Sequence, residues 1–217
     1  AVNCPSISPE WQNPNGVPID AIIFGARRRA VVPLVYEARD WQHGTFLGAT
    51  LRSETTAAAV GKVGVLRRDP MAMVPFCGYN MADYWQHWLS IGTQLRSTGT
   101  VPRIFQVNWF RKDSDGDFLW PGFGDNSRVL AWILDRVDGQ VAADDSPLGL
   151  LPRPGDINTD GLNLSAGAFS QLFEIDPTRW LAEVDDTERF FDTFEGKVPV
   201  AVLRQLSELR LRLQHMP

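Results

Sequence analysis

The chain has 217 residues, and its 26 aspartates and glutamates outnumber its 21 lysines and arginines, which gives a formal charge of −5. A composition of 44% hydrophobic and 22% charged residues is typical of a soluble globular protein, and no apolar run reaches the roughly 18 residues of a membrane-spanning helix. Because the chain is acidic and most of its arginines are scattered, it also lacks the broad basic face that bulk nucleic acid requires. We therefore expect neither a membrane nor a nucleic acid as a partner.

Two apolar runs rich in β-branched residues, 19–24 and 30–36, predict buried strands. The loop between them, Gly25-Ala26-Arg27-Arg28-Arg29, brings three guanidinium groups to a strand end, where functional groups often lie. From 53 to 64 most side chains are small and offer little to anchor in a core, so we expect this segment to move. A short helix is predicted over 83–91.

The middle of the chain combines a strand, a turn and a helix. A strand is predicted over 103–109, and Asp115-Gly116 between aromatic residues predicts a hairpin turn. A helix is expected from about Ser127, with Asp125 or Asn126 capping its first turn. Its apolar stripe is predicted to contain Val129, Leu130, Ile133, Leu134 and Val137.

The last quarter is predicted to be helical. Asp176-Pro177 is a cap followed by proline at the first helical position, and an apolar face continues at Trp180, Val184, Phe191 and Phe194. A final amphipathic helix is marked by Val202, Leu203, Leu206, Leu209 and Leu213.

The cysteines and histidines limit the redox and metal chemistry. Cys4 and Cys77 cannot form a Cys-x-x-Cys site or a disulfide framework, and two free thiols are typical of the cytoplasm, which is the expected location. His43, His87 and His215 do not stand at ligand spacing on one element, so no metal site is predicted. The chain begins with alanine and has no export signal, which favours a piece of a longer protein.

Aromatic side chains gather between 108 and 128, where three phenylalanines and two tryptophans lie on the hairpin and on a loop bracketed by Gly122 and Gly124. Rings presented by such a loop could stack on a flat base, which contributes about 1–3 kcal/mol per ring without choosing among bases. Asn126 carries a donor and an acceptor that match the O6 acceptor and the N1–H or N2–H donors of guanine, but mismatch adenine. An aromatic corner of the core capped by Asn126 accounts for the same residues equally well.

Seven strings along the chain are specific enough to compare with known families: Gly16-Val17-Pro18-Ile19, Ile22-Ile23-Phe24-Gly25, Val32-Pro33-Leu34-Val35-Tyr36-Glu37-Ala38, Trp41-Gln42-His43-Gly44, Arg52-Ser53-Glu54, Phe76-Cys77-Gly78-Tyr79-Asn80-Met81 and Phe118–Arg128. Together they resemble GTP-dependent phosphoenolpyruvate carboxykinase along nearly the whole chain. Only about the last sixty residues show no such family-specific string. Long strings of this kind are much harder to meet by chance than a spaced glycine pattern.

The resemblance implies a mixed α/β fold, the carboxy-terminal part of the carboxykinase fold, with a mixed sheet followed by C-terminal helices. Residues 1–217 would be the nucleotide-binding portion of a longer enzyme that converts oxaloacetate and GTP into phosphoenolpyruvate, GDP and CO2 in gluconeogenesis, with Mn²⁺ and Mg²⁺. The phosphate loop and the metal ligands would lie upstream of residue 1. We therefore expect no catalytic or metal-binding residue here, and no activity from residues 1–217 alone. A monomer is expected for the family, and self-association for an isolated piece with exposed apolar surface.

The resemblance also assigns roles to individual residues. Phe110, Phe118 and Phe123 would line the guanine pocket and Trp109 would back it. Arg27 would reach the nucleotide phosphates, where a planar fork suits oxyanions. The loop that hydrogen-bonds the base would be Phe123, Gly124, Asp125 and Asn126. A mobile lid over 55–65, which closes to exclude water and protect the enolate, would include Thr55, Thr56, Ala57, Ala58, Ala59, Val60, Gly61 and Lys62.

Two other functions stay open at this point. The chain could be a free-standing guanine-nucleotide binding module without catalysis. Alternatively, its eight tryptophans and its Asp/Asn-Gly turns could belong to a carbohydrate-binding domain. Binding of GDP in preference to ADP favours the first, and binding of an oligosaccharide favours the second.

Overall fold

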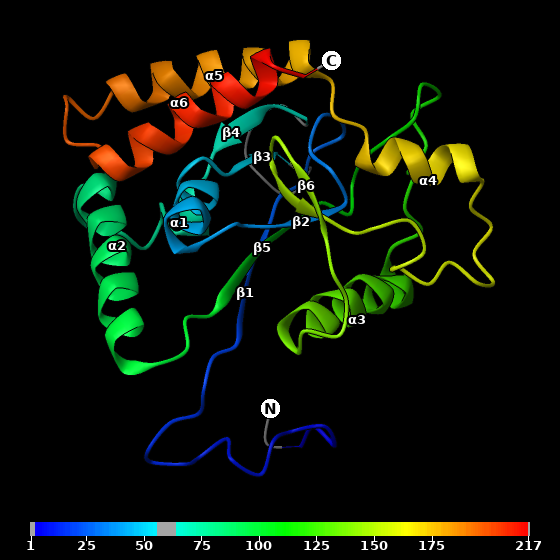
Figure 1. The fold of residues 1–217 in the computed structure, drawn as a ribbon, viewed down its shortest axis with the longest axis horizontal. Coiled ribbons are helices and arrows are strands. Elements are labelled where there is room, and N and C mark those ends of the chain that lie inside the picture. Colours follow the sequence, from blue (N-terminus) through cyan, green and yellow to red (C-terminus); the bar gives the residue numbers. More distant parts are fainter. Residues whose placement is uncertain (1–2, 56–63, 217) are drawn as a thin grey trace.

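A computed structural model of the chain describes residues 3–55 and 64–216, which form a mixed sheet with helices on both of its faces (Figure 1). The five-stranded sheet has the order β1-β5-β2-β7-β6. β1 runs parallel to β5, and the other neighbours are antiparallel. The strands of this sheet are β1 (Ala21–Gly25), β2 (Val35–Glu37), β5 (Arg103–Val107), β6 (Asp144–Ser146) and β7 (Gly149–Leu151). The predicted mixed α/β class is confirmed.

Alternation of side chains along the strands builds a separate core on each face of the sheet. The helices are α1 (Trp41–Ala49), α2 (Met81–Thr98), α3 (Asn126–Val137), α4 (Ala166–Phe173), α5 (Pro177–Asp192) and α6 (Val200–Gln214). Tyr36 and Ile104 face the larger core, which they form with α1, α2, α5 and α6. Val35 and Phe105, their neighbours in the chain, face the smaller core formed with α3 and α4. Within the described residues, no helix has the length and apolar character to cross a membrane.

A separate two-stranded ribbon lies beside the loop that follows β1. It consists of β3 (Arg52–Glu54) and β4 (Leu66–Arg68), which pair antiparallel, and it leads into a short 3-10 turn, η1 (Pro70–Ala72). No pattern in the sequence predicted this ribbon, because three residues are too few to show a strand periodicity.

The second predicted strand is shorter than expected. The prediction covered 30–36, but β2 begins only at Val35. Val31 adopts a φ of +72°, a conformation that no strand contains. The carbonyl of Val32 accepts a hydrogen bond from Nδ2 of Asn108 at 2.9 Å in place of a ladder bond. The first half of this apolar run is therefore a bend held by a buried amide.

The buried face of α3 differs from the predicted stripe. Val129, Trp132 and Ile133 are buried, whereas Leu130 is 41% and Leu134 is 60% exposed. The indole of Trp132 is fully buried. Because burial of so large a ring is favourable, α3 is oriented with the face that carries Trp132 toward the smaller core. The two leucines consequently face solvent.

The other predicted helices are confirmed with different lengths. The helix expected over 83–91 extends from Met81 to Thr98. α5 begins at the predicted cap, where a carboxylate oxygen of Asp176 accepts from the Arg179 backbone N–H at 3.1 Å. In α6, Leu203 is 40% exposed and lies outside the buried face.

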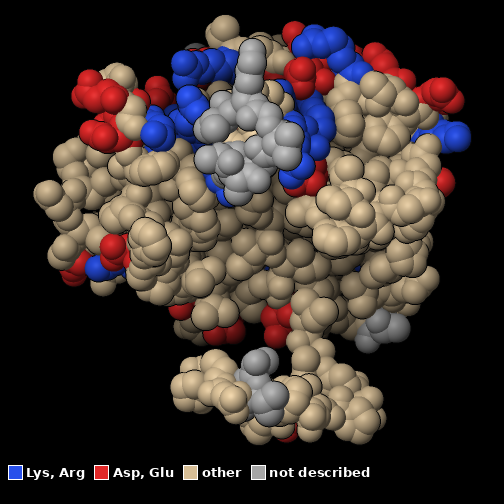
Figure 2. All heavy atoms as spheres, turned by 180° about the vertical axis from the view of Figure 1, so that it is seen from behind, with Lys and Arg blue, Asp and Glu red and all other residues tan. Residues whose placement is uncertain are grey.

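Apolar side chains remain exposed near the start of the chain. Trp11 is 48% exposed, Val17 56%, Ile19 63%, and Ile23 on the unpaired edge of β1 40%. Figure 2 shows broad uncharged areas on one face of the molecule, with most of its charged side chains near the upper rim. Exposed apolar side chains favour association, so the self-association of an isolated piece stays a prediction.

α1 and α2 approach each other closely at a glycine. A Cβ atom on Gly92 would lie 2.1 Å from Cδ1 of Trp41. We expect Gly92→Ala to destabilise the fold by about 1–3 kcal/mol, because overpacking exceeds the helix-propensity gain of alanine. Urea unfolding followed by circular dichroism measures this loss. The matched control is Gly167→Ala in α4, where the new Cβ would meet only the Ser165 hydroxyl at 3.9 Å. Equal unfolding midpoints for the two variants would contradict the predicted clash.

Candidate functional site

Three consecutive arginines follow β1, and each meets a different partner. The buried Arg28 pairs through Nη2 with Oε1 of Glu183 in α5 at 2.6 Å. Arg29 pairs through Nε with Oε2 of Glu54, at the end of β3, at 2.9 Å. Within residues 3–55 and 64–216, Arg27 has no carboxylate partner, and its Nη1 donates to the Glu54 carbonyl at 3.0 Å. Among the residues that the structure describes, the loop therefore presents one half-buried cation with no carboxylate beside it.

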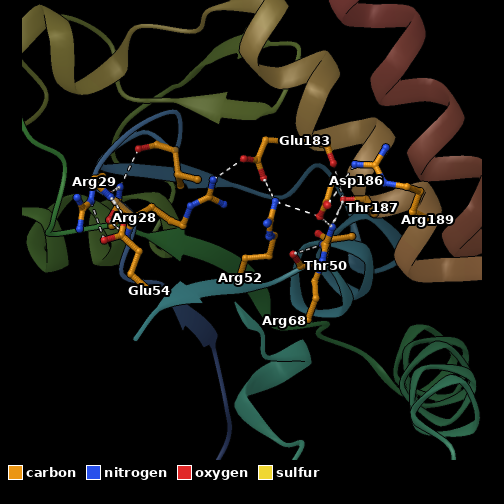
Figure 3. A network of polar contacts seen from close by, with 12 residues as sticks. Arg28, Arg29, Thr50, Arg52, Glu54, Arg68, Glu183, Asp186, Thr187 and Arg189 are labelled. Atoms are coloured by element: carbon orange, nitrogen blue, oxygen red, sulfur yellow. Dashed lines mark hydrogen bonds and ion pairs between the residues drawn. The ribbon is translucent and has the colours of Figure 1, made fainter. Parts of the chain in front are cut away.

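Figure 3 shows that the ion pairs continue from this loop into α5. Oε2 of Glu183 accepts from Arg52 at 2.9 Å, and Asp186 pairs with Arg52 at 3.1 Å and with Arg68. Arg52 and Arg68 are opposite each other on β3 and β4, so α5 holds both strands of the ribbon. Burial, together with the charge of Arg52, lowers the pKa of Arg68 to about 10, which leaves it a cation at neutral pH.

Asn108 joins the arginine loop to the aromatic hairpin. It follows β5 and is fully buried. Its Oδ1 accepts from the backbone N–H groups of Arg28 at 3.1 Å and Phe110 at 3.2 Å, and its Nδ2 donates to the Arg28 carbonyl at 2.8 Å. Sequence reasoning did not assign it to the site. The available signal was an amide directly after a buried strand, since such a group needs several hydrogen-bond partners.

The predicted hairpin is present. Lys112 and Phe118 form a bridge between its arms, and Gly116 adopts a φ of +89° in its turn. The rings of Phe110 and Phe118 meet edge to face, with centroids 6.1 Å apart and planes at 72°. Cζ of Arg27 lies 5.1 Å from the centroid of the Phe110 ring, within the range of a cation–π contact. The structure thus brings Arg27 and two of the three predicted phenylalanines together.

The other two aromatic residues are placed differently. Phe123 is 96% exposed, and in the described part of the chain its ring has no aromatic neighbour. It has a φ of +48° and follows Gly122, whose φ is +79°. Trp109 is half-buried and packs against the smaller core. The rings therefore do not form a closed parallel slot, and Phe123 has no ring contact with Phe110 or Phe118.

The predicted cap of α3 is wrong, because Asp125 and Asn126 bond to other side chains. η2 (Phe123–Asp125) runs directly into α3, which begins at Asn126 and has no side-chain cap. Oδ1 of Asp125 accepts from Nε of Arg128 at 3.0 Å. Oδ1 of Asn126 accepts from the indole N–H of the buried Trp120 at 2.9 Å. The Asn126 amide nitrogen has no partner among the described residues, so its two N–H donors are available. The carbonyl of Gly124 accepts from the Ser127 hydroxyl at 2.6 Å.

An open groove of about 550 Å³ lies beside Phe118. This volume is within the range of small-molecule sites. Its other wall comes from a segment that sequence reasoning missed, because nothing in its composition marks it as a binding loop. The lining residues are Asp113, Phe118, Leu119, Pro121, Asp125, Gly161, Leu162, Asn163, Leu164, Ser165 and Ala168.

Two other hollows differ in size and charge. A groove of about 400 Å³ lies beside the hairpin, and its lining includes Arg29 of the arginine loop together with Arg111 and Lys112. Burial lowers the pKa of Arg111, which pairs with Glu174 at 3.5 Å. A cavity of about 40 Å³ beside Arg28 and other members of the ion-pair network is too small for a nucleotide.

The resemblance also assigned residues to a lid and placed the metal ligands outside this chain. Thr55 follows β3, whereas Thr56, Ala57, Ala58, Ala59, Val60, Gly61 and Lys62 lie outside the described residues. Nowhere in the described ranges do three or more histidine, cysteine, aspartate or glutamate side chains form a group that could hold a metal ion. These residues therefore do not fit a Mn²⁺ or Mg²⁺ centre.

Comparison with known proteins agrees with the resemblance. Residues 1–212 match the family model described as the phosphoenolpyruvate carboxykinase C-terminal P-loop domain. The phosphoenolpyruvate carboxykinase (GTP) of Treponema pallidum (strain Nichols) is 50% identical over 215 residues, and that of Chlamydia trachomatis serovar D is 50% identical over 213 residues. Both alignments cover 98% of this chain and 35% of the relative, so the chain spans about a third of the length of these relatives. The chain belongs to the family of GTP-dependent phosphoenolpyruvate carboxykinases.

Proposed function

We propose that residues 1–217 bind the guanine nucleotide of an enzyme that converts oxaloacetate and GTP into phosphoenolpyruvate, GDP and CO2. The relatives are named for phosphoenolpyruvate carboxykinase and GTP, and they are about three times as long as this chain. The observation that carries the proposal is the guanidinium of Arg27, which has no carboxylate partner among the described residues and lies 5.1 Å from the Phe110 ring centroid. This pair of groups suits a nucleotide, since a base stacks on aromatic rings and phosphates bind a planar cation.

The base would be selected by the amide donors of Asn126. The carbonyl of this side chain already accepts from Trp120, whereas its N–H groups have no partner among the described residues and can donate to a ligand. Guanine presents the O6 acceptor at the position where adenine presents an amino donor, so at this position guanine accepts such a bond and adenine does not. The open groove beside Phe118 has room for a base, and the exposed ring of Phe123 would gain burial by covering it.

The phosphate loop and the metal ligands belong, in this proposal, to a part of the enzyme outside residues 1–217. The family model is named for a P-loop, but the sequence contains no Gly-x-x-x-x-Gly-Lys-Ser/Thr string. Residues 1–217 alone would therefore bind nucleotide without turnover. The lid over 55–65 is part of the same proposal and is supported by the resemblance alone.

Tryptophan fluorescence tests the nucleotide site, because Trp109 and Trp120 flank the hairpin in the sequence. We expect GDP, but not ADP, to quench the emission of the chain at millimolar concentration. Asn126→Asp should weaken GDP binding about tenfold or more, because it removes the amide donors and places a negative charge near O6. This variant keeps an acceptor for the Trp120 indole, so the fold should be retained.

Asn15→Asp is the matched control, since it makes the same chemical change on the exposed N-terminal segment. It should leave the GDP response unchanged. Equal quenching by GDP and ADP, or no response to either, would contradict the proposed function.

A further inference from the structure

Glu54 contacts the arginine loop through both its main chain and its side chain. Its backbone N–H donates to the Arg27 carbonyl at 2.8 Å, and its own carbonyl accepts from Nη1 of Arg27 at 3.0 Å. The carboxylate binds Arg29 instead, where Oε1 accepts from the backbone N–H at 2.8 Å and Oε2 from Nε at 2.9 Å. One residue therefore holds two arginines, and its carboxylate is directed to Arg29, as Figure 3 shows.

The Glu54 carboxylate is buried, so it matters which cation neutralises it. The Glu54 side chain is only 10% exposed, whereas that of Arg29 is 58% exposed. A carboxylate with so little access to water requires a cation beside it. Among the described residues, Arg27 is a second cation beside Glu54, because its guanidinium is bonded to the carbonyl of the same residue. Arg28 cannot compete, since it is buried and paired with Glu183 at 2.6 Å.

We propose that Arg29 is a positioning residue that acts through Glu54. By neutralising this carboxylate, Arg29 prevents it from pairing with Arg27 and keeps the Arg27 guanidinium available for an anion. In the proposed function, on which this inference rests, the anion is the phosphate chain of the guanine nucleotide. Arg29 therefore affects phosphate binding without contacting the phosphates.

A direct phosphate contact by Arg29 is the competing explanation, and a pair of variants separates the two. Arg29→Ala weakens phosphate binding in either case, because it removes a cation or releases the Glu54 carboxylate toward Arg27. Adding Glu54→Gln removes the released charge while keeping an acceptor for the backbone N–H of residue 29. Phosphate binding recovers in the double variant only if Arg29 acts through Glu54.

Isothermal titration of the chain with GDP and with guanosine separates phosphate binding from base binding. We expect Arg29→Ala to weaken GDP binding about tenfold or more and to change guanosine binding by less than about twofold. The double variant Arg29→Ala/Glu54→Gln should bind GDP within about threefold of the unsubstituted chain.

The matched control is Asp69→Asn, which removes one negative charge from the end of β4. Its partner Arg67 is 60% exposed and Asp69 is 16% exposed, so this pair resembles Arg29 and Glu54 in exposure but does not contact the arginine loop. Asp69→Asn should leave GDP binding unchanged.

Three results would overturn the inference. A double variant as weak as Arg29→Ala would make Arg29 a phosphate ligand. An equal loss of GDP and guanosine binding in Arg29→Ala would make its role merely structural. Failure of the unsubstituted chain to bind either ligand would contradict the proposed function itself, and the inference with it.

Discussion

Arg27→Ala is expected to abolish the preference of the chain for GDP over guanosine. Among the three arginines after β1, only Arg27 lacks a carboxylate partner in the described part of the chain, so only its charge is available to phosphates. A hydrogen bond between charged groups contributes about 1.5–3 kcal/mol, which corresponds to a loss of roughly 10- to 150-fold in GDP affinity. Guanosine binding should stay unchanged, because the base is bound by other residues.

Two further variants make this result interpretable. Arg27→Lys retains the charge but loses the planar fork, so its GDP affinity should lie between those of the parent chain and Arg27→Ala. Arg67→Ala removes a 60% exposed arginine from the neighbouring ribbon and should have no effect. If Arg27→Ala weakened guanosine as much as GDP, Arg27 would be a structural residue and the assignment of the phosphate site would be wrong.

The largest loss of stability is expected from Glu37→Ala. Glu37 belongs to β2 in the middle of the sheet and is 3% exposed. Its two carboxylate oxygens accept from Arg103 of β5 and Arg136 of α3, both at 2.7 Å. Removal of the carboxylate leaves Arg136, which is 12% exposed, without a counter-charge. We expect a loss of about 3–5 kcal/mol in the free energy of unfolding, measured by urea denaturation.

An exposed ion pair is the control for this prediction. Arg39 and Asp145 are also 2.7 Å apart, but Asp145 is 71% exposed, so solvent screens the pair. Asp145→Ala should therefore lower the free energy of unfolding by less than about 1 kcal/mol. Similar losses in the two variants would mean that burial does not determine the contribution of the Glu37 pairs.

Local sequence patterns predicted the structure correctly where a few neighbouring residues determine it. Asp176-Pro177 predicted the start of α5, because the cap and the proline act within one turn. Asp115-Gly116 predicted the hairpin for the same reason. The extent of β2 could not be predicted, since the bend before Val35 depends on a hydrogen bond from Asn108, which is distant in the sequence. The buried face of α3 also depended on a distant partner, the sheet against which Trp132 packs.

The amino-acid sequence alone identified the family, the mixed α/β class, the arginine loop and the aromatic hairpin. All of these can be predicted from residues that are close together in the sequence. The comparisons confirm the family. The tertiary structure decided which of the three arginines is left without a carboxylate partner in the described part of the chain. Glu54 and Glu183 lie 25 and 155 residues from the arginines that they neutralise, and no local pattern links residues so far apart. Folding brings these charges within bonding distance, where Coulomb attraction and burial select the pairs.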